Sequence, residues 1–135
     1  MTIHWPNNPH QVRILIADDD RMIRRLLHST LRGLEHTRVI HAESGEEALA
    51  VYHRHLPNLV FLDIAMPGKL DGMAVLDKLR SSGHPVFIVM ITAHGTAENV
   101  DVAIKKGVNG FLVKPFTAER IYKTLENFHK SKINT

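Results

Sequence analysis

Two periodicities of apolar residues alternate along the chain. Four short runs, at residues 12–17, 59–63, 86–92 and 110–113, are almost continuously apolar. Such runs are typical of strands that are buried on both faces of a parallel sheet, because neither face meets water. A fifth run, at residues 38–42, is more polar, which favours a strand at the edge of the sheet.

The segments between these runs repeat apolar residues every three or four positions, which is the period of an amphipathic helix. The predicted apolar face of the first helix consists of Met22, Ile23, Leu26, Leu27, Thr30, Leu31 and Leu34. The second helix is predicted to begin at Ser44, because Ser44 and Glu47 have the spacing of a capping box, in which each side chain binds a free backbone N–H group.

Three further helices follow the same period. The third is predicted to begin near Asp71 and to stop at Gly83, and the fifth to be capped by Thr117. The fourth is expected to stop at Gly107 and to present an inward face of Val100, Ala103 and Ile104. Five alternating strands and helices predict an α/β fold, a parallel sheet with helices on both faces.

Length and composition limit the class of protein. A chain of 135 residues suits a single domain, which we place at residues 11–131, after an extended N-terminal arm at residues 1–10 and before a C-terminal tail at residues 132–135. No apolar run approaches the roughly 18 residues of a membrane span, and the N-terminus lacks the apolar core of a secretory signal.

The charged and sulfur-containing residues add two expectations. The chain has no cysteine, which excludes disulfides and suits a cytoplasmic location. Its net charge is only +3, so we interpret basic pairs such as Arg24–Arg25 and Lys105–Lys106 as solvated helix surface. No direct contact with nucleic acid is expected.

Polar residues lie at the end of four of the predicted strands or directly after it. In chain order they are Asp18-Asp19-Asp20, Asp63, Thr92 and Lys114. Because the carboxyl ends of parallel strands lie at one edge of a sheet, where ligands bind, we expect these side chains to converge there. Asp20 is the exception, since an aspartate just before a predicted helix is more typical of an N-cap.

Converging carboxylates repel one another, so one of them would stay protonated near neutral pH unless a cation were bound. An all-oxygen set suits Mg²⁺ or Mn²⁺ rather than zinc. A metal beside a lysine and a hydroxyl group can stabilise phosphoryl transfer, and a carboxylate can itself be the nucleophile. The chain has no Gly-rich loop of the Walker type, so a nucleotide donor is not expected.

Four segments, ILIADDD, LVFLDIAMPGKLDG, VMITA and GFLVKPFT, resemble those of bacterial response-regulator receiver domains such as the chemotaxis regulators. The resemblance covers residues 12–130. It implies a flavodoxin-like, doubly wound five-stranded parallel sheet of strand order 2-1-3-4-5 with five helices. It also implies a phosphoacceptor of a two-component phosphorelay, which is not an enzyme beyond catalysing its own phosphorylation and dephosphorylation.

The resemblance implies partners as well. The phosphodonor would be a sensor histidine kinase or a phosphotransfer protein, and an unknown downstream protein or output domain would respond. No membrane is implied. Since no output domain fits in 135 residues, we expect either a stand-alone regulator or a receiver that belongs to a larger chain.

By the same resemblance, Asp63 is the phosphoacceptor. Asp19 and Asp63 would bind the metal directly, and Asp18 would hold it through water. The backbone carbonyl of Ala65 would complete the protein ligands. Thr92 would donate its hydroxyl to a phosphoryl oxygen.

Lys114 would pair with another phosphoryl oxygen, and the Lys114–Pro115 bond resembles one that is cis in the family. Phe111 occupies the position of the aromatic residue that turns inward on phosphorylation and alters the surface of the fourth helix, fifth strand and fifth helix. It lacks the hydroxyl of the tyrosine often found there, so its switch would depend on packing alone.

The chain also departs from the family pattern. The loop at residues 66–72 is one residue longer than the common form, which leaves the geometry before the third helix open. Ala65 and His94 occupy variable positions that flank the phosphoryl group and tune its lifetime in the family.

Three alternatives compete with this interpretation. A haloacid-type hydrolase needs an acid–base aspartate two residues after the nucleophile, where this chain has Ala65. A flavodoxin-like cofactor binder needs a Ser/Thr/Gly-rich first loop, whereas three aspartates would repel a phosphate. The ten histidines include no i, i+4 pair, so we interpret them as surface residues rather than a metal site.

Overall fold

The computed structural model describes residues 12–34, 37–93 and 95–133. Within them strands and helices alternate in the order β1 (Val12–Ala17), α1 (Arg21–Leu31), β2 (Thr37–Ala42), α2 (Gly45–His55), β3 (Leu59–Asp63), α3 (Gly72–Ser81), β4 (Phe87–Thr92), α4 (Ala97–Lys105), β5 (Gly110–Val113) and α5 (Ala118–Ile133). The expected N-terminal arm, residues 1–10, lies outside the described residues.

The five strands form one parallel sheet in the order β2-β1-β3-β4-β5. The predicted α/β class and strand order are therefore confirmed, and the more polar β2 does lie at an edge. The chain leaves β1 toward β2 and later returns past β1 to β3. At such a reversal of strand order the loops after the two neighbouring strands lead to opposite faces of the sheet and open a crevice between them.

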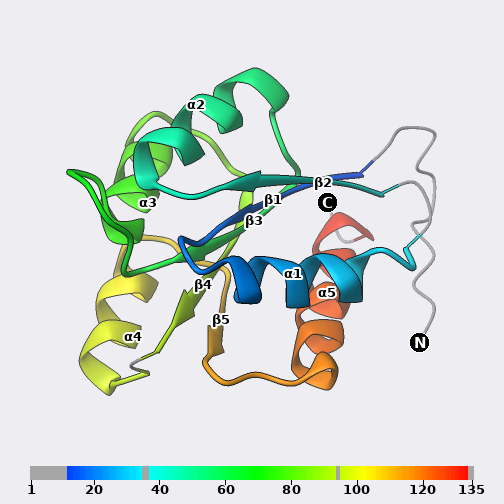
Figure 1. Cartoon of the computed structure of the whole chain (residues 1–135). Coiled ribbons are helices and arrows are strands. Elements are labelled where there is room, and N and C mark those ends of the chain that lie inside the picture. Colours follow the sequence, from blue (N-terminus) through cyan, green and yellow to red (C-terminus); the bar gives the residue numbers. More distant parts are fainter. Residues whose placement is uncertain (1–11, 35–36, 94, 134–135) are drawn as a thin grey trace.

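The helices cover the sheet in two layers, with α2 and α3 on one side and α1 and α5 on the other (Figure 1). The core beneath α1 and α5 includes Ile14, Ile16, Leu27, Leu31, Phe61, Val89, Ile121, Leu125 and Phe128. The core on the other face includes Leu15, Tyr52, Val60, Leu62, Leu76, Leu79, Met90 and Ala103. Strand residues alternate between the two cores, which is why the strands are apolar at nearly every position.

Side-chain caps determine where the helices begin. A backbone N–H group of the first turn is bound by the side chains of Asp20, Ser44, Asp71, Thr96 and Thr117. The predicted caps at Ser44, Asp71 and Thr117 are thus confirmed, as is Asp20 as an N-cap. Gly83 and Gly107 follow α3 and α4 with φ values of 80° and 93°, as expected for residues that end helices.

The buried face of α1 is narrower than predicted. Leu27 and Leu31 are fully buried, but Met22 and Leu26 are 69% and 41% exposed. Arg24, interpreted from the sequence as solvated surface, is buried. The helical period gives the direction of a buried face but not its width, and α1 packs only along a stripe against β1, β2 and α5.

The buried face of α4 is also narrower than predicted. Ala103 is fully buried, whereas Ile104 is 59% exposed and Val100 is half-buried. The prediction of Ile104 as an inward residue is therefore wrong. Of the three residues, only Ala103 belongs to the core on this face.

The last helix extends beyond the predicted domain boundary. α5 runs to Ile133, so it continues past residue 131 into the expected tail, and residues 134–135 lie outside the described part. No helix among the described residues is long and apolar enough to cross a membrane.

Candidate functional site

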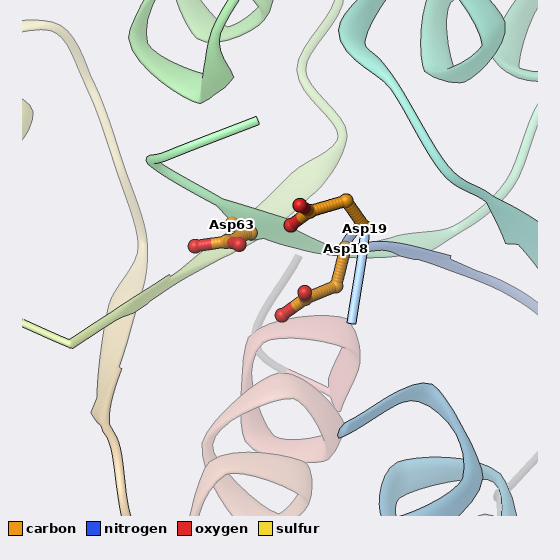
Figure 2. A group of neighbouring side chains, drawn as sticks. All are labelled: Asp18, Asp19 and Asp63. Atoms are coloured by element: carbon orange, nitrogen blue, oxygen red, sulfur yellow. The ribbon is translucent and has the colours of Figure 1, made fainter. Parts of the chain in front are cut away.

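The predicted site residues gather at the carboxyl edge of the sheet. Asp18 directly follows β1, and Asp63 is the last residue of β3, the neighbouring strand. Oxygen atoms of Asp18, Asp19 and Asp63 lie within 4.8 Å of one another, and Figure 2 shows the three side chains at the ends of these two strands. The predicted convergence of carboxylates is present in the structure.

Lys114, which directly follows β5, adds a positive charge to this cluster of carboxylates. Its Nζ atom lies 3.0 Å from Asp18 Oδ2 and 3.5 Å from Asp63 Oδ2. Its backbone N–H donates to the carbonyl of Thr92 at 2.8 Å, which ties the loop after β5 to the end of β4. The Lys114–Pro115 bond is cis, as the resemblance implied.

Burial and charge perturb the acidic groups. Asp18 is fully buried, Asp63 is 4% exposed, and Asp19 is exposed. Burial, followed by the charge of Asp18, raises the pKa of Asp63 to about 7, although Lys114 opposes the shift. Burial alone would lower the pKa of Lys114, but its ion pairs with Asp18 and Asp63 outweigh burial and raise that pKa.

The residues present fit a hard divalent cation. Among the described residues, the cluster has three carboxylates, and the ammonium group of Lys114 pairs with two of them, so negative charge is in excess. Asp18 Oδ2 is buried and receives no aligned hydrogen bond, although Lys114 lies within ion-pairing distance. A buried oxygen with unused acceptor capacity among carboxylates suits Mg²⁺ or Mn²⁺ and their bound water.

The remaining predicted residues lie around this cluster. Thr92 is buried at the end of β4, one position beyond the residue paired with Asp63. Ala65 is exposed, and its backbone N–H donates to Asp63 Oδ1 at 3.3 Å. Phe111 of β5 is half-buried against the core under α2, α3 and α4. His94 lies outside the described residues.

The longer loop after β3 is held by α2. Both Lys69 and Leu70 donate their backbone N–H groups to Glu46 Oε1, at 3.0 and 3.1 Å. Gly45 permits this contact, because a Cβ atom there would lie 2.1 Å from the Leu70 carbonyl oxygen. The extra residue therefore belongs to a loop that is hydrogen-bonded to the first turn of α2.

Gly72, the first residue of α3, packs closely against the backbone of Asp63, the proposed phosphoacceptor. A Cβ atom on Gly72 would lie 2.1 Å from the backbone oxygen of Asp63. The N–H group of Gly72 donates to the carbonyl of Ile64 at 2.9 Å. A side chain at this position would displace the backbone that carries the acceptor.

Sequence reasoning missed several contacts, among them the two hydrogen bonds from Lys69 and Leu70 to Glu46, which we call the Glu46 clamp, and a contact between two histidines. His28 Nδ1 and His41 Nε2 lie 2.7 Å apart and are half-buried, so the interpretation of every histidine as a surface residue is wrong for this pair. Spacing at i, i+4 could not reveal it, because the two residues come from α1 and β2. Within the described ranges, the only group of three or more potential metal ligands is the aspartate cluster.

Comparison with known proteins agrees with this geometry. Residues 14–126 match a family model described as the response regulator receiver domain. The chemotaxis protein CheY of Listeria monocytogenes is 34% identical over 119 residues, covering 88% of this chain and 99% of that protein. A protein named "Probable transcriptional regulator ycf27" from Porphyridium aerugineum is 38% identical over 126 residues, covering 90% of this chain. The match spans only 51% of that second relative.

Solved structures are similar over most of the chain. The receiver domain of NtrX from Brucella abortus is 36% identical with a TM-score of 0.79, covering 87% of this chain and 98% of that one. The CheX–CheY–BeF3–Mg²⁺ complex from Borrelia burgdorferi is 29% identical with a TM-score of 0.79, covering 86% and 87%. These matches favour a receiver over a haloacid-type hydrolase or a flavodoxin-like cofactor binder.

The raised pKa of Asp63 predicts a pH-dependent stability of the metal-free protein. A carboxyl whose pKa is about 7 when folded holds its proton more tightly than in the unfolded chain, so its contribution to stability is lost as pH rises from about 4 through 7. Asp63→Asn should therefore be more stable than wild type at pH 8, by about 1.4 to 3 kcal/mol, the equivalent of one to two pKa units. Urea unfolding in EDTA measures the difference.

The matched control is Asp101→Asn, which removes an exposed carboxylate of α4. It should change stability little at either pH. A gap between Asp63→Asn and wild type that is the same at pH 4.5 and pH 8 would contradict the raised pKa.

The Glu46 clamp predicts local protection of the loop. In Glu46→Gln the neutral amide is a weaker acceptor than a carboxylate, so the amides of Lys69 and Leu70 should exchange with solvent faster, on the order of five-fold. Hydrogen exchange followed by NMR measures this, with Glu47→Gln as the control on the same turn. Unchanged exchange at both amides in Glu46→Gln would show that the clamp does not order the loop.

Proposed function

This chain belongs to the response-regulator receiver domain family, and from that premise we propose that Asp63 is its phosphoacceptor. The chain is a receiver domain of the two-component type, and receiver domains act as phosphoacceptors. The observation that carries the assignment is a nearly buried carboxylate, Asp63, that lies beside two further carboxylates and a lysine at the carboxyl edge of the sheet.

In the proposed step a carboxylate oxygen of Asp63 attacks the phosphorus atom of the donor. An O–P bond forms as the P–N bond of a phosphohistidine breaks, and the imidazole leaves with the electron pair. Attack by water later cleaves the acyl phosphate and restores the carboxylate. The protein's catalysis would be confined to its own phosphorylation and dephosphorylation, through positioning and charge.

Lys114 and Thr92 would stabilise the transferred group. The ammonium of Lys114 is 3.5 Å from Asp63 Oδ2, so it can follow the negative charge onto the phosphoryl oxygens. The hydroxyl of Thr92, one strand away, would donate to another of these oxygens. Both groups act on charge that spreads over the equatorial oxygens in the transition state.

The proposed metal ligands are the carboxylates of Asp19 and Asp63, Asp18 through water, and the backbone carbonyl of Ala65. Mg²⁺, when bound, would supply positive charge against the phosphoryl oxygens. The excess of carboxylates over ammonium groups supports this set, and so does the Mg²⁺ named with the similar CheY of Borrelia burgdorferi. Mn²⁺ would suit the same oxygen ligands.

The proposed partners are a sensor histidine kinase or a phosphotransfer protein as donor and a downstream protein or output domain as target. The similar CheY of Borrelia burgdorferi is described in a complex with CheX, which supports a protein target without identifying it. The proposed location is the cytoplasm, which suits a chain without cysteine.

The proposed output is a change on the surface formed by α4, β5 and α5. When the Thr92 hydroxyl moves toward a phosphoryl group on Asp63, space would open behind it for Phe111. Phe111 is half-buried and packs only partly into the core, so it can gain contacts by turning inward. The population shift is bounded by the difference in contacts between the two states.

The acceptor is tested by labelling with a small phosphodonor. Incubation with acetyl phosphate and Mg²⁺ should add the mass of one phosphoryl group to the wild type. Asp63→Asn should remain unlabelled while it unfolds cooperatively like the wild type, because an amide is not a nucleophile here. Asp101→Asn is the control and should label fully; labelling of Asp63→Asn to the wild-type extent would contradict the assignment.

The switch is tested with beryllofluoride as a phosphoryl mimic. In the wild type, NMR shifts should extend from Asp63 to Phe111 and to Val102 of α4. In Thr92→Ala the shifts near Asp63 should remain and those at Val102 should be lost. Thr124→Ala, which truncates a buried threonine of α5 instead, should keep both; wild-type shifts confined to the neighbourhood of Asp63 would contradict the switch.

A further inference from the structure

A buried arginine supports the loop that carries two of the proposed metal ligands. Arg24 of α1 is 7% exposed. Its Nη1 donates to the backbone oxygen of Asp18 at 2.7 Å, and its Nη2 donates to Glu43 Oε1 at 3.1 Å. The guanidinium therefore joins the carboxyl end of β1 to the residue that follows β2.

A buried guanidinium is costly unless its donors are used. The neighbours of Arg24 on the inward stripe of α1 are Leu27 and Leu31, which are fully buried. An apolar side chain would pack there without the loss of hydration. The use of an arginine at this position needs a reason other than packing.

The backbone of Asp18 is fixed on both sides. Its N–H group donates to the carbonyl of Ala42 at 3.1 Å, and its carbonyl accepts from Arg24. Its Oδ1 atom accepts from the N–H of Asp20 at 2.8 Å. Glu43, the next residue after Ala42, forms an ion pair with the Arg24 guanidinium. The contacts among Asp18, Ala42, Glu43 and Arg24 therefore form a closed ring that joins the ends of β1 and β2.

The position of Asp19 depends on this ring of contacts. The carbonyl of Asp18 and the N–H of Asp19 belong to one planar peptide group, so a fixed carbonyl sets the direction in which the chain enters Asp19. Over the described ranges, the exposed side chain of Asp19 takes part in no hydrogen bond or ion pair. Its position beside Asp18 and Asp63 therefore depends on the direction of its backbone.

We propose that Arg24 is a positioning residue for the acidic site, acting through the Asp18 carbonyl and Glu43 to orient the peptide that carries Asp19. The inference rests on the proposed function, in which Asp19 binds the metal. It also gives the edge strand β2 a part in the site, because β2 leads into Glu43. Residues that hydrogen-bond to metal ligands and orient them typically contribute 10- to 100-fold to metal affinity.

The test compares Mg²⁺ affinity with phosphorylation in the purified full chain. Arg24→Lys keeps the charge but cannot reach two acceptors in a planar fork, and Glu43→Gln weakens one acceptor at an exposed position. Arg25→Ala removes the exposed neighbour of Arg24 and is the matched control. Calorimetry gives the Mg²⁺ dissociation constant, and acetyl phosphate labelling over a range of Mg²⁺ concentrations gives the rates.

Arg24→Lys should bind Mg²⁺ about ten-fold more weakly, while its labelling rate at saturating Mg²⁺ stays within about two-fold of wild type. Glu43→Gln should bind about three-fold more weakly, and Arg25→Ala should match wild type. In the metal-free protein the amides of Asp19 and Asp20 should exchange faster in Arg24→Lys, a local effect that general loss of stability would not confine to this loop.

Wild-type Mg²⁺ affinity in a folded Arg24→Lys would overturn the inference. If Arg24→Lys does not fold, Glu43→Gln decides, and an unchanged affinity in that variant overturns it as well. A wild type that binds Mg²⁺ without being labelled would contradict the proposed function, and the affinities of the variants would still decide the role of Arg24. A wild type that does not bind Mg²⁺ would contradict both.

Discussion

The ion pairs of Lys114 with the buried carboxylates of Asp18 and Asp63 are the interaction on which the site depends. One ammonium group faces two carboxylates that are almost removed from water, with a third, Asp19, at the rim. Burial first, and then the charge of Asp18, keep the pKa of Asp63 raised at about 7, because the lysine reduces these effects but does not cancel them. A divalent cation, once bound, would offset the remaining negative charge.

Contacts with neighbouring parts of the fold hold the loops after β1 and β3, which carry the proposed ligands. The connection from β2 to α2 contributes no proposed ligand, yet Glu43 contacts the guanidinium under the Asp18 loop and Glu46 holds the loop after β3. Gly72 lets α3 pack directly against the backbone of Asp63. The carboxylates are thus placed by backbone hydrogen bonds and close packing, so that the charged groups stay close together in the metal-free protein.

The sequence predicted the strands and the acidic cluster because both follow from short-range rules. Apolar runs locate buried strands, and residues at their carboxyl ends must share one edge of a parallel sheet. The strand order came from the resemblance to receiver domains and is confirmed by the strand pairing. The roles assigned to single residues such as Asp63 and Thr92 also came from it, and they stay predictions until they are tested.

What the sequence did not reveal depends on contacts between distant segments. The helical period placed Met22 and Ile104 on apolar faces but could not give the width of the stripe that the sheet covers, and both are exposed. Arg24 was interpreted as surface because of its charge, although its spacing from Leu27 and Leu31 fits the buried stripe of α1.

The most direct test of the central charge imbalance is calorimetric titration with Mg²⁺ in buffers of different ionisation enthalpy. At pH 7 the wild type should release roughly half a proton per bound ion, because Asp63 titrates at about 7 and must lose its proton to bind metal. The release should vanish in Asp63→Asn, and a wild type whose binding heat at pH 7 does not depend on the buffer would contradict the coupling between Asp63 and the metal.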